Sequence, residues 1–312
     1  MRPGPTSRAL AWVGDRLPSF LPPSDPTASR DRLKPLSELA LVHFHLAGRL
    51  GPTGELDDWR EFLVAACTDG LAARAATAAP ADGLYLMQPC LWLRAAGHRD
   101  DDCERVLRDQ ARAGLRPGSP GVLHALQAAG LLRTPPDWPG LCRTRVLRRE
   151  WTDEDLVRDA YRVTHAVFYA TDMGRTTLAL SPAEQDRFVS LLERLRAYAR
   201  DAGRWDLLIE TLIALRGIGA AAPAAEDAWA VRREELAVHC DGGTPLDEAA
   251  VRLLTRSRSR PDEAALFRSC YHATLADLLL QSLSVPAPEG DPAPCPKPSH
   301  PKAPSLTRTS SS

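Results

Sequence analysis

The sequence predicts an all-α fold, arranged as an irregular antiparallel bundle of helix hairpins or as an α/α barrel-like array of them. Apolar residues recur at helical spacing through most of the 312 residues, and helix-start and helix-stop signals separate the runs. No segment combines alternating apolar and polar residues with the β-branched enrichment that is typical of a strand. The connections are mostly short, which predicts antiparallel neighbours, and no fixed-period repeat indicates a regular solenoid.

One folded helical region is expected over residues 31–284, between two extensions. Residues 1–30 contain a short first helix and a proline-rich loop. Residues 285–312 are rich in proline and serine, which predicts a disordered tail because such a segment has little apolar surface to bury. Prolines also interrupt the helical pattern at 131–151, which indicates either a weak break between two helical layers or a long loop.

Within this region the periodicity predicts the following helices: 31–48, 56–78, 84–97, 100–113, 120–130, 152–171, 182–202, 205–217, 224–240, 246–255 and 262–284. Their starts carry caps followed by proline, as at Ser181-Pro182, where Glu184 completes a capping box. Their ends are marked by glycines that follow alanine and suit a left-handed terminal position: Gly48, Gly97, Gly114, Gly130 and Gly203.

The composition excludes several classes of protein. Hydrophobic residues make up 44% of the chain and charged residues 25%, and the formal net charge of -1 argues against a nucleic-acid partner. Only three of the 39 basic residues are lysines, so the abundant arginine indicates a GC-rich bacterial genome rather than a polyanionic ligand. No apolar run is long enough for a signal peptide or a membrane span. We therefore expect a cytoplasmic protein with no membrane partner and with its seven cysteines reduced.

The helix predicted over 152–171 carries the strongest candidate site. Three aromatic residues at i, i+4 and i+8 share one of its faces: Tyr161, His165 and Tyr169. Phe168 and Asp172 border this face, while the opposite face is apolar. A helix needs only one apolar face to dock, so a second face of titratable aromatic residues is typical of a helix that lines a pocket.

The residue types on this face suggest acid–base chemistry. His165 can act as a general acid or base near neutral pH, and Asp172 would orient its imidazole if the following loop folds back. Tyr161 and Tyr169 can donate hydrogen bonds to a developing oxyanion. The alternative is a satisfied core network without a catalytic task, with Gly174 at the left-handed position that ends the helix.

The helix predicted over 262–284 carries a second candidate at Cys270–Thr274. A pocket between this helix and 152–171 would bring His272 or Tyr271 near His165, although ordinary helix packing explains the residues equally well. Taken together, the predicted catalytic residues are His165, Asp172 and His272. The predicted substrate contacts are Tyr161, Phe168, Tyr169, Tyr271 and Thr274.

No cofactor or metal is predicted. The chain has no Walker A loop, G-x-G-x-x-G, HExxH or paired CxxC. A zinc site built by His165, by His239 or Cys240, and by His272 is an alternative that nothing in the spacing supports.

Both candidate segments match motifs of one family. The pattern Y-x2-T-H-x2-F-Y-x-T-D-x-G at Tyr161–Gly174 and Y-H-x-T-L at Tyr271–Leu275 resembles an actinobacterial family of uncharacterised all-helical proteins. Such proteins often occur beside genes for specialised metabolites, including modified peptides. The resemblance covers about residues 31–284 and implies a role in such a pathway, but it implies no activity for any residue.

The leading hypothesis is an accessory or tailoring protein of bacterial specialised metabolism. It would act on a peptide or small-molecule intermediate by acid–base chemistry, through cyclisation, addition or elimination, with a protein of the same pathway as a further partner. The alternative is a non-catalytic helical scaffold or regulatory protein-binding module. The first hypothesis requires the site residues to converge on one cavity, whereas the second predicts an extended concave apolar surface.

Overall fold

The computed structural model describes residues 4–22, 30–78, 80–112, 119–256 and 262–285. Within these ranges the chain folds into helices and turns without a β-strand, which confirms the all-α prediction. None of the helices in these ranges is long and apolar enough to cross a membrane. The predicted disordered tail, from residue 286 on, lies outside the described residues.

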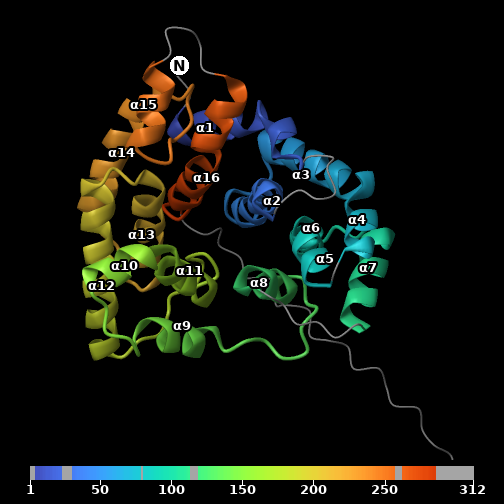
Figure 1. Ribbon diagram of the computed structural model, residues 1–312, viewed down its shortest axis with the longest axis horizontal. Helices are drawn as coiled ribbons and strands as arrows, with labels where there is room; N and C mark the ends of the chain where they lie inside the picture. Colours follow the sequence, from blue (N-terminus) through green and yellow to red (C-terminus); the bar gives the residue numbers. More distant parts are fainter. Residues whose placement is uncertain (1–3, 23–29, 79, 113–118, 257–261, 286–312) are drawn as a thin grey trace, which may run out of the picture.

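Six helices form a closed inner ring, as the α/α barrel-like alternative predicted (Figure 1). Each packs against the next in chain order, and the last packs against the first. They are α2 (Arg30–Leu50), α6 (Gln88–Ala95), α8 (Pro120–Ala128), α11 (Ala160–Ala170), α13 (Trp205–Gly217) and α16 (Glu263–Ser282). Because the ring is closed, residues far apart in sequence face one common interior.

The remaining helices connect the inner ones and pack around them (Figure 1). They are α1 (Pro5–Gly14), α3 (Gly54–Ala66), α4 (Ala72–Thr77), α5 (Pro80–Leu86), α7 (Asp101–Arg112), α9 (Trp138–Val146), α10 (Asp153–Arg158), α12 (Pro182–Asp201), α14 (Pro223–Ala237) and α15 (Glu248–Arg256). A 3-10 turn at Leu17–Phe20 follows α1, and a π-helical turn at Cys67–Leu71 joins α3 to α4.

One continuous hydrophobic core runs from Ala9 on α1 to Leu280 on α16. Its centre is α13, in which every residue except Arg216 is buried. A helix that is apolar nearly all round can be stable in water only when neighbours cover it on every side. The two acidic residues of α13, Asp206 and Glu210, are therefore buried as well, and each needs a partner inside the protein.

Several predicted boundaries are wrong for local reasons. The helix predicted over 152–171 divides into α10 and α11 at Asp159, whose backbone turns at φ -103° and ψ 19° and whose carboxylate pairs with Arg149 at 2.9 Å. The helix predicted over 56–78 is interrupted by the π-helical turn. The segment 131–151 contains α9, because Asp137 caps it and Pro139 lies in the first turn, where no N–H is needed.

The helix ends follow the glycine signals in part. Gly97, Gly130 and Gly203 have positive φ as predicted. The helix α2 instead runs past Gly48 to Leu50, and Gly51 takes the left-handed conformation at φ +72°. Gly114 lies outside the described residues.

The capping box of α12 allows a test of how much a helix cap predicted from the sequence contributes to stability. Ser181 Oγ accepts from the Glu184 N–H, and the Glu184 carboxylate accepts from the Ser181 N–H at 2.8 Å. We expect Ser181→Ala to lower the free energy of unfolding by about 1 kcal/mol, because the Glu184 N–H loses its acceptor and the Glu184 carboxylate loses the Ser181 hydroxyl. Urea unfolding measures this. Ser190→Ala, an exposed position on the same helix, is the control and should change stability by less than about 0.5 kcal/mol; equal effects would contradict the prediction.

Candidate functional site

The inner ring lines a cavity of about 350 Å³ that is partly open to solvent. This volume lies in the range of small-molecule sites. Most of its wall is apolar or aromatic: Leu41, Val42, Tyr85, Trp92, Phe168, Tyr169, Met173, Ile213, Leu275, Ala276 and Leu279. The charged and imidazole groups in the wall are Lys34, Glu38, His165, Glu210 and His272, and they come from four helices of the ring.

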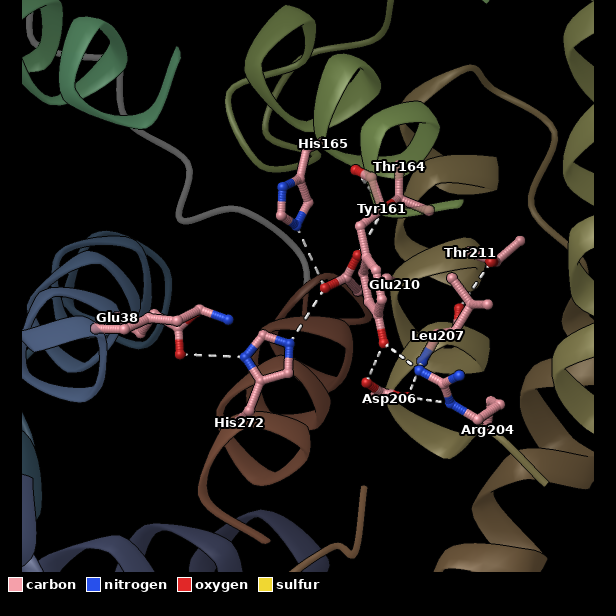
Figure 2. A network of polar contacts seen from close by, with 11 residues as sticks. Glu38, Tyr161, Thr164, His165, Arg204, Asp206, Leu207, Glu210, Thr211 and His272 are labelled. Atoms are coloured by element: carbon pink, nitrogen blue, oxygen red, sulfur yellow. Dashed lines mark hydrogen bonds and ion pairs between the residues drawn. The ribbon is translucent and has the colours of Figure 1, made fainter. Parts of the chain in front are cut away.

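Glu210 on α13 lies at the centre of these groups (Figure 2). Its Oε1 lies 3.3 Å from His272 Nε2 on α16 and 3.5 Å from His165 Nε2 on α11. Its Oε2 accepts a hydrogen bond of 2.6 Å from the Thr164 hydroxyl. The side chain of Glu210 is only 3% exposed, so two imidazoles and a hydroxyl replace the water that a carboxylate normally binds.

The chain of charges continues from His272 to α2 (Figure 2). His272 Nδ1 lies 3.1 Å from Glu38 Oε2, and Lys34 Nζ lies 3.3 Å from Glu38 Oε1. The order Lys34, Glu38, His272, Glu210, His165 thus alternates basic and acidic groups across the cavity wall. These pairs connect α2, α16, α13 and α11 to one another.

Burial and pairing compete in setting the protonation state of His272. Burial lowers the pKa of His272, but the attraction of Glu38 and the hydrogen bonds to Glu210 and Glu38 outweigh it and raise the pKa to about 10. Burial likewise opposes ionisation of Glu210, yet His165 and His272 hold the pKa of Glu210 well below its usual range. At neutral pH His272 is therefore an imidazolium between two carboxylates and cannot act as a base.

His165 differs from His272 in both exposure and pairing. Its side chain is 41% exposed, against 17% for His272, and it faces one carboxylate instead of two. His165 Nε2 lies 3.5 Å from Glu210 Oε1, and the tautomer that carries its proton on Nε2 has its lone pair on Nδ1. Figure 2 shows Nδ1 turned away from Glu210. A carboxylate that orients an imidazole in this way is a general-base arrangement.

The predicted aromatic face of α11 exists, but its residues have different surroundings. The ring centroids lie 6.1 Å apart for Tyr161 and His165, and 6.2 Å apart for His165 and Tyr169. Phe168 and Tyr169 line the cavity. The Tyr161 hydroxyl donates to Asp206 and accepts from Arg204 Nη2 at 2.9 Å (Figure 2), and Tyr161 is not part of the cavity wall.

The structure does not place Asp172 beside His165. Thr171 ends α11, and three left-handed residues follow: Asp172 at φ +48°, Met173 at φ +55° and Gly174 at φ +78°, of which only Gly174 was predicted. The turn directs the carboxylate to His124 Nε2 on α8, at 3.2 Å, and to Arg175. Burial raises the pKa of Asp172, but the hydrogen bond from His124 and the neighbouring positive charges lower it to about 2. Glu210, rather than the predicted Asp172, is the carboxylate next to His165.

The other predicted contacts on α16 lie away from the cavity wall. Tyr271 stacks on Phe267 with ring centroids 5.0 Å apart. Thr274 is fully buried, accepts from the Thr244 N–H at 2.9 Å and donates to the Cys270 carbonyl at 2.8 Å. Only His272 of this segment reaches the cavity.

The ligands considered for zinc do not come together. His239 is exposed at the end of α14, whereas Cys240 is buried beside Trp12, whose indole N–H donates to its carbonyl at 3.0 Å. Among the described residues, no three His, Cys, Asp or Glu side chains form a group suited to a metal ion.

The two carboxylates of the network were missed in the sequence, although a signal for Glu210 was present. The segment WDLLIETLIAL is apolar on every face except for acids at i and i+4, Asp206 and Glu210. Acids in a helix without a polar face indicate buried carboxylates that require partners. Glu38 follows Lys34 by four residues, which by itself indicates only a surface ion pair.

The raised pKa of His272 predicts that stability falls as the pH rises. The charged form stabilises the fold fully below the unfolded pKa of about 6.5, and this contribution is lost as the pH rises through about 10. Between about pH 7 and pH 8 the free energy of unfolding should fall by up to about 1.4 kcal/mol per pH unit more in the wild type than in His272→Gln. Urea unfolding at several pH values measures the slopes. His239→Gln should keep the wild-type slope; parallel slopes for His272→Gln and wild type would refute the pairing.

Comparison with known proteins places the chain in a family. No curated protein and no solved structure matches the sequence. One family model, described as "Domain of unknown function (DUF6895)", matches residues 6–282, which include all six inner helices and every residue of the charged network. The chain therefore belongs to the DUF6895 family.

Proposed function

We propose that this protein is an enzyme that binds a small, mostly apolar organic molecule in the ring cavity and transfers a proton through His165. The observation that carries the proposal is the Glu210 carboxylate, which is buried between two imidazoles while one of them, His165, opens onto the cavity. Burying a carboxylate is costly. A site that keeps one in contact with an accessible imidazole has the arrangement of a general base and its orienting group.

The two imidazoles have separate tasks in this proposal. His165 Nδ1 accepts the proton from the substrate, and Glu210 stabilises the imidazolium that results. Glu210 stays ionised throughout, because His165 and His272 lower the pKa of its carboxyl group. His272 and Thr164 hold the two oxygens of Glu210, so they are positioning residues.

The volume of the cavity limits the size of the substrate that it can hold. A volume of about 350 Å³ suits a small molecule or a single side chain of a peptide. Cyclisation, addition and elimination each include a proton transfer that a general base can perform. We further propose, from the resemblance of the motifs at Tyr161–Gly174 and Tyr271–Leu275 alone, that this reaction is a tailoring step in bacterial specialised metabolism.

Deuterium incorporation tests the proposal even when the product has not been identified. The purified protein is incubated in D2O with a small-molecule extract of the organism that encodes it, and mass spectrometry detects metabolites that gain deuterium or are consumed. We expect His165→Gln to lower this activity by about 10²- to 10⁴-fold, since the general base is lost. Glu210→Gln should lower it by about 10²-fold or more, since the orienting charge is lost.

The control replaces an exposed histidine by the same residue, His239→Gln, and should keep full activity. Thermal unfolding confirms that each variant is folded. If folded His165→Gln retains wild-type exchange and consumption, His165 is not the base. If the wild type transforms no metabolite, the protein-binding alternative is favoured.

A further inference from the structure

With His165 in the neutral form that a base needs before it accepts a proton, the charges that line the cavity cancel at neutral pH. Lys34 and His272 are cationic, because their acidic neighbours overcome burial and raise both pKa values. Glu38 and Glu210 are anionic, because their basic neighbours lower the pKa of each carboxyl group. A ligand with a net charge would bring an unpaired charge into a mostly apolar space, which is costly. The part of the ligand inside the cavity is therefore expected to be neutral.

One hydroxyl in the cavity wall is available to such a ligand. Tyr169 follows His165 by one helical turn on α11, and both residues line the cavity. Within the described residues the Tyr169 hydroxyl has no hydrogen-bond partner, whereas the Tyr161 hydroxyl is committed to Asp206. A Cβ atom added at Gly121 on α8 would lie 3.3 Å from the Tyr169 hydroxyl oxygen, so the glycine keeps the space beside this oxygen free.

We propose that Tyr169 donates a hydrogen bond to the oxygen that becomes negative in the reaction, and that the substrate is a neutral carbonyl compound with an acidic C–H next to the carbonyl. This inference rests on the proposed function of His165. His165 Nδ1 takes the proton from the carbon, the C–H electron pair forms the C=C bond of an enolate, and the carbonyl π pair moves to the oxygen. The imidazolium then returns the proton to a carbon of the substrate, so charge and atoms balance.

The surroundings of Tyr169 suit a hydrogen-bond donor. Burial, together with the negative charges of Glu210 and Glu38, raises the pKa of Tyr169, so the phenol keeps its proton at neutral pH. A donor fixed on the same helix as the base requires no rearrangement when charge develops, which is how oxyanion sites accelerate reactions. In this proposal His165 acts on the C–H of the substrate, and Tyr169 acts on its carbonyl oxygen.

Phenols test the inference because a bound phenolate resembles an enolate in charge and shape. The probes are phenol, 4-chlorophenol, 4-cyanophenol and 4-nitrophenol, whose acidity increases in this order. Calorimetry gives the affinity of the whole protein for each, and the visible absorption of 4-nitrophenol reports its ionisation. In the wild type we expect affinity to rise with acidity. Tyr169→Phe should bind the most acidic phenol about tenfold to hundredfold more weakly and show a flatter dependence on acidity.

The controls separate this inference from the proposed function. Tyr198→Phe, on α12 outside the cavity wall, should bind all four phenols like the wild type. His165→Gln should abolish ionisation of bound 4-nitrophenol but still bind phenol itself. If His165→Gln preserves ionisation, His165 is not the base. Three outcomes would overturn the assignment of Tyr169. Tyr169→Phe could bind the phenols with wild-type affinity, it could lose the same affinity for all four, or the wild type could bind none of them.

Discussion

The burial of Glu210 is the constraint on which the arrangement of the site depends. A carboxylate inside a protein costs several kcal/mol unless charged or hydrogen-bonding groups replace its water. Here three groups do so, from two helices: the Thr164 hydroxyl and His165 on α11, and His272 on α16. Since α13 is covered on all sides by its neighbours, the carboxylate cannot turn to solvent, and these helices must keep their present spacing to satisfy it.

The same constraint extends around the ring. His272 is stable as an imidazolium because Glu38 on α2 balances its second N–H, and Lys34 in turn pairs with Glu38. The contact between α16 and α2 is also the one that closes the ring, between the last and the first inner helix. The ion pair between Glu38 and His272 thus lies at the helix contact that closes the ring. We expect a substitution of Glu38 or His272 to change both the shape of the cavity and the protonation of the network.

Two histidines of one network have different properties because their surroundings differ. His272 is flanked by two carboxylates and is mostly buried, which fixes its charge. His165 touches one carboxylate and opens onto the cavity, which leaves one nitrogen for a ligand. The tyrosines of α11 divide in the same way, since Asp206 and Arg204 engage Tyr161 while Tyr169 faces the cavity. The residue type is the same within each pair, so the neighbours from other helices decide how the two side chains differ.

The sequence by itself determined the all-α fold and the face of α11. Helical periodicity, the capping box at Ser181 and the i, i+4 spacing of His165 and Tyr169 are local properties, and local backbone geometry is enough to produce them. Tertiary structure alone decided which carboxylate orients His165. Asp172 is near in sequence, but a left-handed turn sends it to His124. Glu210 is far in sequence, and it reaches His165 only because the ring places α13 beside α11, where its buried charge has no other way to be satisfied.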